Sequence, residues 1–106
     1  RWYVAWGGRT LIDNYHAAAP DQRFAYDFLV ERDGAVFASD GTRNEDHFCW
    51  GEPVLAPAAG TVVQAVGDVP DNERPGVQAP GVSPPGNHVV IDHGSGEYSL
   101  IAHFQH

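Results

Sequence analysis

The sequence predicts an all-β fold, and three observations lead to this prediction. Apolar residues alternate with polar ones at a period of two in several short segments, as the side chains of half-buried strands do. Stretches rich in glycine and proline separate these segments and are typical of turns. No apolar stripe of helical spacing has a useful length, since residues 17–20 are too few for a helix and end in proline.

The first half of the chain contains two expected strands. Residues 1–6, Arg-Trp-Tyr-Val-Ala-Trp, have the composition of a strand. Residues 24–28 carry an aromatic side chain at every second position, so a strand there places three rings on one face and Asp27 on the other. A carboxylate in such an aromatic strand is costly unless it is paired or coordinated.

The second half is expected to contain four strand segments. Residues 54–55 and 61–66 flank Pro-Ala-Ala-Gly at 57–60, which predicts a tight turn between strands. Residues 88–92 and 98–104 are separated by a glycine-rich connection, the pattern of a hairpin.

Length and patterning favour one domain covering residues 1–106, with no internal repeat. Residues 67–86, rich in proline, glycine and aspartate, are expected to be one long irregular segment.

Charge narrows the classes of partner. The formal net charge is −8, and all six basic residues are arginines. This balance argues against binding a nucleic-acid backbone or an anionic membrane surface, because both require clustered cations. No apolar run approaches the roughly 20 residues needed for a membrane span, and no signal-peptide pattern opens the sequence. We therefore expect no nucleic-acid partner and no membrane span.

The single cysteine, Cys49, cannot form an intrachain disulfide and is expected to be a small, half-buried hydrophobic residue. A nucleophilic role would require an activating partner such as His47. Neighbouring strand side chains point to opposite faces, so the adjacency of these two residues does not bring them into contact.

Histidine and aspartate are the main candidates for chemistry. Six histidines in 106 residues is a high content, and zinc binding is a common reason for histidine enrichment near carboxylates. Asp27 is the leading carboxylate, the alternatives being a salt bridge to Arg23 or an exposed edge position. His103 is expected to face away from the apolar side of its strand, the alternative being a histidine bonded to backbone. His93, beside a glycine, favours a turn role.

Four segments, taken in order, carry a resemblance to a known family. They are Gln-Arg-Phe-Ala-Tyr-Asp-Phe at 22–28, Gly-Glu-Pro-Val-Leu-Ala-Pro-Ala-Ala-Gly-Thr-Val-Val at 51–63, Gly-Asn-His-Val-Val-Ile-Asp-His-Gly at 86–94, and Tyr-Ser-Leu-Ile-Ala-His-Phe at 98–104. Together they resemble the lysostaphin-type (LytM-type) zinc metallopeptidases, which cut peptide bridges of the cell wall.

The resemblance implies a fold, a cofactor and a reaction. The fold is an antiparallel two-sheet scaffold, the cofactor is zinc, and the reaction is metal-assisted hydrolysis of a peptide cross-link in peptidoglycan. By this match Asp27 is the zinc-binding aspartate. His103 is the catalytic histidine that positions the attacking water and steadies the developing oxyanion. The resemblance also implies an extracytoplasmic location, whether periplasmic, secreted or associated with the cell wall.

The chain departs from the family pattern at its first zinc ligand. The family places a histidine four residues before the aspartate, and here that position holds Arg23, which cannot ligate a metal. The nearest substitute is His16, in Asn-Tyr-His at 14–16. A loop over residues 17–22 is expected to return His16 to Asp27, as in the subset of the family that opens with Asn-Tyr-His.

A second departure concerns the third ligand. The family takes it from a later His-x-His, and this sequence has only His103 and His106, three residues apart. We therefore expect residues 1–106 to be the N-terminal part of a longer domain, with strand pairing continued by further residues or by another chain. The 106 residues alone are expected to be inactive, poorly soluble or self-associating.

Two alternatives belong to other classes. A domain of this family that has lost catalysis would bind peptidoglycan or regulate a partner enzyme, and Arg23 together with the missing His-x-His favours this interpretation. Residues 54–62 also resemble biotinyl and lipoyl carrier domains. Those carriers attach their cofactor to a lysine, and the sequence contains none.

Overall fold

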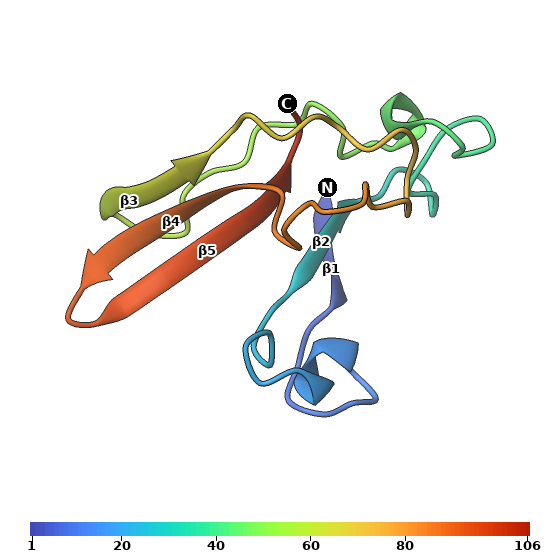
Figure 1. Ribbon diagram of the computed structural model, residues 1–106. Helices are drawn as coiled ribbons and strands as arrows, with labels where there is room; N and C mark the ends of the chain where they lie inside the picture. The colour runs from blue at the N-terminus through green and yellow to red at the C-terminus, as the bar shows by residue number, and fades with distance from the viewer. The chain divides into compact units, whose positions relative to one another are not determined.

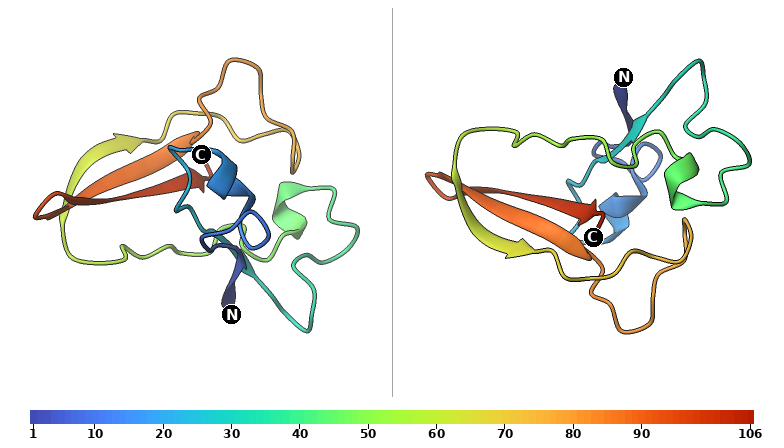
Figure 2. Two further views of the ribbon diagram at one scale, coloured as in Figure 1. Left: turned by 90° about the horizontal axis from the view of Figure 1, so that it is seen from below. Right: turned by 90° about the horizontal axis from the view of Figure 1, so that it is seen from above.

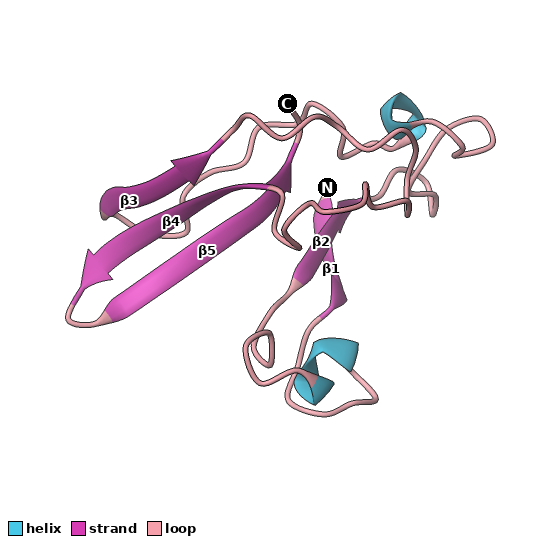
Figure 3. Ribbon diagram, viewed as in Figure 1, coloured by secondary structure: helices cyan, strands magenta, loops and turns pink.

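Five strands form two small antiparallel sheets in the computed structural model, which describes all residues 1–106 (Figure 1). The chain divides into two compact units, Arg1–Trp50 and Gly51–His106, and each unit carries one sheet. Two single turns of 3-10 helix are the only helical elements (Figure 3). The predicted all-β fold class is therefore confirmed. Neither helical turn has the length and apolarity that crossing a bilayer requires.

The first sheet pairs β1 (Trp2–Trp6) with β2 (Asp27–Val30). Trp2 lies opposite Val30, and Trp6 lies opposite Asp27 after an irregularity in the register. The strand predicted for residues 1–6 is confirmed.

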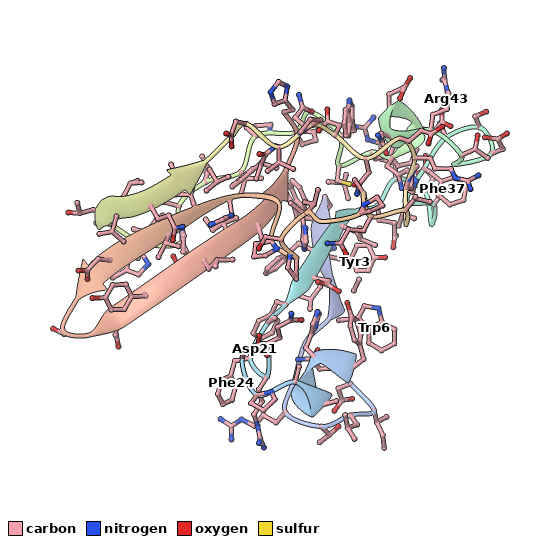
Figure 4. The ribbon with its side chains drawn as sticks, in the orientation of Figure 1. Tyr3, Trp6, Asp21, Phe24, Phe37 and Arg43 are labelled. Carbon is pink, nitrogen blue, oxygen red and sulfur yellow. The ribbon has the colours of Figure 1, made fainter.

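The strand predicted for residues 24–28 is wrong in its first half, because β2 begins only at Asp27. The carbonyl oxygens of Arg23 and Ala25 accept hydrogen bonds from a side chain, and the Ala25 N–H donates to Gln22 in a turn. These groups are therefore not available to a strand ladder. Phe24 lies on the turns that precede β2, with its side chain 74% exposed (Figure 4).

A loop held by an ion pair follows β2 in the first unit. It contains the second helical turn, η2 (Asn44–Asp46). Asp46 is buried and accepts from the Arg43 guanidinium at 3.0 Å and from the Arg43 backbone N–H at 3.1 Å. These two bonds, the side-chain bond foremost, lower the pKa of Asp46 below its usual value of 3.8.

This lowered pKa predicts how the loop responds to acid. A carboxyl group whose pKa falls on folding stabilises the fold above its unfolded pKa, and that contribution is lost as the pH falls through the folded pKa. We therefore expect the loop at 43–46 to stay ordered at pH 3.8 and to loosen only in stronger acid. The amide signal of Arg43, followed by NMR during an acid titration, measures the transition. Asp46→Asn is expected to remove it, and a transition above pH 3.8 would contradict the assignment.

The second sheet has the strand order β3-β4-β5, with β3 at Thr61–Val66, β4 at Asn87–Gly94 and β5 at Glu97–Phe104. β4 and β5 lie side by side along their length as a hairpin (Figure 2). The predicted hairpin is confirmed, each strand being longer than expected by one to three residues. Within this sheet β3 and β5 each have one free edge.

Two expectations for the second unit can be compared with the structure. Residues 54–55 are not a strand, and the prolines at 53 and 57 explain this because they have no N–H to offer a ladder. Residues 67–86 contain no regular element, as predicted. β5 ends at Phe104, and the backbone N–H of His106, beyond the strand, donates to Asp71 at 2.7 Å.

Candidate metal centre

A series of short turns joins β1 to β2 and places the first candidate ligand. The chain leaves β1 and enters η1 (Tyr15–Ala18), for which Asn14 is the N-cap. Each of three N–H groups then bonds to the carbonyl three residues before it, the last being Ala25 N–H to Gln22 at 2.8 Å. Successive three-residue turns therefore bring the chain from η1 back to the start of β2 without a helix or strand between them.

The structure brings His16 beside Asp27. His16 is buried, with 7% of its surface exposed, and its Nε2 lies 3.7 Å from Oδ1 of Asp27. The side chain of Asp27 is 37% exposed. Arg23 makes no ion pair with Asp27, so the salt-bridge alternative considered from the sequence does not occur. The loop predicted to return His16 to Asp27 is present.

The side chain of Asn14 contacts both the ring and the backbone of His16. Oδ1 of Asn14 lies 2.8 Å from Nδ1 of His16 and 3.1 Å from the His16 backbone nitrogen. Because an amide oxygen can only accept, Nδ1 must be the donor. In the neutral ring Nε2 then carries a lone pair, and Nε2 is the ring nitrogen that lies 3.7 Å from the carboxylate of Asp27.

Tyr15 holds the other oxygen of Asp27. Its hydroxyl donates to Oδ2 at 3.1 Å. Burial of the hydroxyl, then the negative charge of Asp27 and the hydrogen bond to it, raise the pKa of Tyr15 above its usual value of 10.0. The phenol therefore remains a donor at neutral pH. The Tyr15 ring packs on the ring of His16 with 4.0 Å between the ring centroids, and it makes an edge contact with the Trp6 ring with 5.5 Å between the centroids.

The donor atoms of His16 and Asp27 fit two positions of a zinc site. Two ligands of a tetrahedral zinc ion lie roughly 3.4 Å apart, close to the 3.7 Å between Nε2 and Oδ1. A lone pair and a carboxylate oxygen that face each other repel unless a proton or a cation lies between them. In neither unit, however, do three histidine, cysteine, aspartate or glutamate side chains gather so as to hold a metal ion.

His103 lies in the second unit, at an irregularity of the β4–β5 ladder. Its neighbours Ala102 and Phe104 pair with His88 and Asn87, which leaves His103 as an extra residue. Its φ angle is +65°, a left-handed conformation that is uncommon for histidine. The regular alternation of β5 is interrupted at His103, whose side chain is exposed while Ala102 and Phe104 are half-buried.

The bulge at His103 is held from both sides. The His103 backbone N–H donates to the carbonyl of Pro85 at 3.1 Å. The amide of the buried Asn87 donates to Phe104 at 3.3 Å and exchanges two further bonds with Val69. The surrounding hydrogen bonds thus maintain a backbone conformation that is itself unfavourable, a pattern that is common at functional sites.

The other histidines are bonded to backbone or to neighbouring side chains. His93 contacts the carbonyl of Ala59 at 2.9 Å through Nδ1 and the hydroxyl of Ser99 at 2.8 Å through Nε2, so its ring links the segment before β3 to β5. His88 donates from Nδ1 to the carbonyl of Gly86, and His47 donates from Nε2 to the carbonyl of Gly41. His93 lies in β4 and not in the turn expected for it, and these contacts give it a structural role.

The sequence reasoning missed Asn14 and Tyr15. The signal for Asn14 was present, because an asparagine before a short helical turn often caps it by bonding the N–H two residues later. Nothing in the sequence marked Tyr15, since its contact with Asp27 spans twelve residues and depends on how the intervening turns fold.

No protein-family model, curated protein or solved structure matches this chain.

Proposed function

We propose that the chain belongs to a zinc-dependent endopeptidase that hydrolyses peptide cross-links of bacterial peptidoglycan, on a scaffold of the lysostaphin type. The observation that carries the proposal is the pairing of His16 Nε2 with Asp27 Oδ1, two metal-binding atoms 3.7 Å apart with no proton donor between them in the neutral state. The order of the four sequence segments is the second support. An extracytoplasmic location follows from the substrate and is part of the same proposal.

In this proposal His16 and Asp27 hold the zinc, which supplies Lewis acidity to polarise a peptide carbonyl and to acidify water. Asp27 contributes a negative charge that lowers the net charge of the site, and burial of His16 limits the access of solvent to one side of it. His103 holds or moves a proton at its imidazole and steadies the oxygen of the scissile carbonyl as charge develops on it.

A zinc hydrolase needs a third protein ligand, and the 106 residues do not provide one beside His16 and Asp27. We propose that a further segment of the natural protein or a second chain provides it. The free edge of β5 is a site at which such a segment can add as a strand.

The test compares the 106-residue chain with the natural protein. Both are purified, their zinc content is measured, and both are incubated with cross-linked peptidoglycan while new amino termini are followed by mass spectrometry. We expect the natural protein to contain one zinc per chain and to cut cross-links until a chelator is added, and the 106 residues to do neither. Hydrolysis by the 106-residue monomer would show that its own residues complete the site.

The second candidate is a domain of the same scaffold that binds peptidoglycan, or regulates a partner enzyme, without catalysis. The observations that favour it are Arg23 at the position of a ligand and the presence of only two donor groups at the centre. The same measurement separates the two functions, because a natural protein that binds peptidoglycan without zinc and without new amino termini is the non-catalytic form.

A further inference from the structure

Asn14 is the only large side chain that is fully buried in the structure, and it is polar. Its amide nitrogen lies 3.0 Å from the carbonyl oxygen of Ala25, 3.2 Å from that of Gly8 and 3.5 Å from that of Arg23. Carbonyl oxygens accept and never donate, so this end of the amide must be the NH₂ group. The orientation of the Asn14 side chain is therefore fixed by the backbone on both sides of the loop.

The fixed amide leaves its oxygen facing His16. Both the backbone N–H and Nδ1 of His16 lie within 3.1 Å of that oxygen. A histidine that ligates a metal through Nε2 usually donates Nδ1–H to such an acceptor, which sets the tautomer and the ring orientation. Asn14 occupies this place before any metal is bound.

Tyr15 has the corresponding relation to Asp27. The Tyr15 hydroxyl is bonded to Oδ2 of Asp27, and the other carboxylate oxygen, Oδ1, is the one nearer His16. The tyrosine ring is itself positioned by its contacts with Trp6 and His16. The tripeptide at 14–16 therefore contains one of the two candidate metal ligands, His16, together with the groups that orient both His16 and Asp27.

We propose that Asn14 and Tyr15 are positioning residues: Asn14 fixes the tautomer of His16 so that Nε2 is unprotonated, and Tyr15 fixes the rotamer of Asp27 so that one oxygen faces Nε2. The effect on metal affinity rests on the proposed function, whereas the tautomer and the rotamer are properties of the metal-free chain. Removing an orienting partner of this kind typically weakens metal binding about 10–100-fold.

The metal-free test uses NMR on the natural protein, stripped of metal, in mildly alkaline solution, where imidazole rings are neutral. We expect the ring nitrogens of His16 to show the proton on Nδ1, and the side-chain couplings of Asp27 to show one rotamer. Asn14→Ala is expected to give a mixture of tautomers, and Tyr15→Phe to average the rotamers of Asp27. A proton on Nε2 of the parent, whether alone or in a doubly protonated ring, would overturn the role of Asn14 even if the alanine variant does not fold.

The metal arm titrates Zn²⁺ into the same metal-stripped natural protein and follows the NMR signals of the His16 ring. Tyr15→Phe keeps the aromatic contacts and removes only the hydroxyl, so we expect binding about tenfold weaker than in the parent. Tyr26→Phe is the matched control, since Tyr26 stacks on Phe28 and its hydroxyl takes part in no hydrogen bond of the structure.

The possible outcomes separate the two proposals. Equal zinc affinity and a single Asp27 rotamer in Tyr15→Phe would reject the role of Tyr15 while leaving the zinc site intact. Absence of zinc binding in every variant and in the natural protein would reject the proposed function, and the tautomer and rotamer measurements would still decide the roles of Asn14 and Tyr15.

Discussion

Asp27→Asn is expected to weaken zinc binding at the proposed centre by more than about 100-fold, because loss of a direct ligand should exceed the 10–100-fold effect of losing an orienting partner. The substitution removes the negative charge and keeps the shape of the side chain. Tyr15 can still donate to the amide oxygen, and Trp6 still pairs with residue 27 through the backbone. The first unit should therefore fold, and hydrolysis should be lost with the metal.

Asp21→Asn is the matched control for this experiment. Asp21 lies in the same unit, on the exposed turns before β2 (Figure 4), and makes no ion pair or hydrogen bond in the structure. The control removes the same charge without touching the centre, so zinc content should not change. Equal zinc content in Asp27→Asn and its parent, measured by metal analysis of the purified proteins, would reject Asp27 as a ligand.

His103→Gly is expected to separate stability from activity. A residue with a side chain costs about 1–2 kcal/mol in the left-handed region, whereas glycine adopts it freely. We therefore expect His103→Gly to be about 1 kcal/mol more stable than His103→Ala in denaturant unfolding. Both variants should lose hydrolysis by about 10²–10⁴-fold if His103 transfers a proton in the reaction.

The control for this comparison is Ser95, which also has a positive φ angle, +55°, in the turn between β4 and β5. Ser95→Gly should be more stable than Ser95→Ala for the same backbone reason and should leave hydrolysis unchanged. Equal stability of His103→Gly and His103→Ala would mean that the backbone conformation of residue 103 in the bulge carries no energetic cost. Full activity in either variant would remove His103 from the mechanism.

The parts of the fold that were predictable from sequence are those determined by local pattern. The β4–β5 hairpin was predictable because two segments of alternating residues flank a glycine-rich turn. The residues that pair across the two strands are also close to each other in sequence. The start of the strand predicted at 24–28 was wrong because the Asn14 side chain donates hydrogen bonds to the carbonyls of Arg23 and Ala25. A contact over nine to eleven residues leaves no trace in the alternation of aromatics.

The candidate centre was predictable to a similar extent. Asp27 and His16 were identified as residue types suited to zinc, and the structure places them 3.7 Å apart. The residues that orient them were not identified, since hydrogen bonds to a buried amide depend on the folded loop. For His103 the residue could be named but its backbone could not, because a bulge is fixed by the partners of the two neighbouring strands and by residues 85–87.

The capping of η1 by Asn14 has a consequence for how such a centre can vary between proteins. The position of His16 is set by an asparagine two residues before it, and not by the strand that carries Asp27. The turns between them can therefore lengthen or shorten without moving the histidine ring, provided that two backbone carbonyls still meet the amide. In this chain residues 17–26 stand in place of the three-residue interval of His-x-x-x-Asp. Asn-x-His followed at any short distance by an aspartate that opens a strand is then the pattern by which related sequences can be recognised.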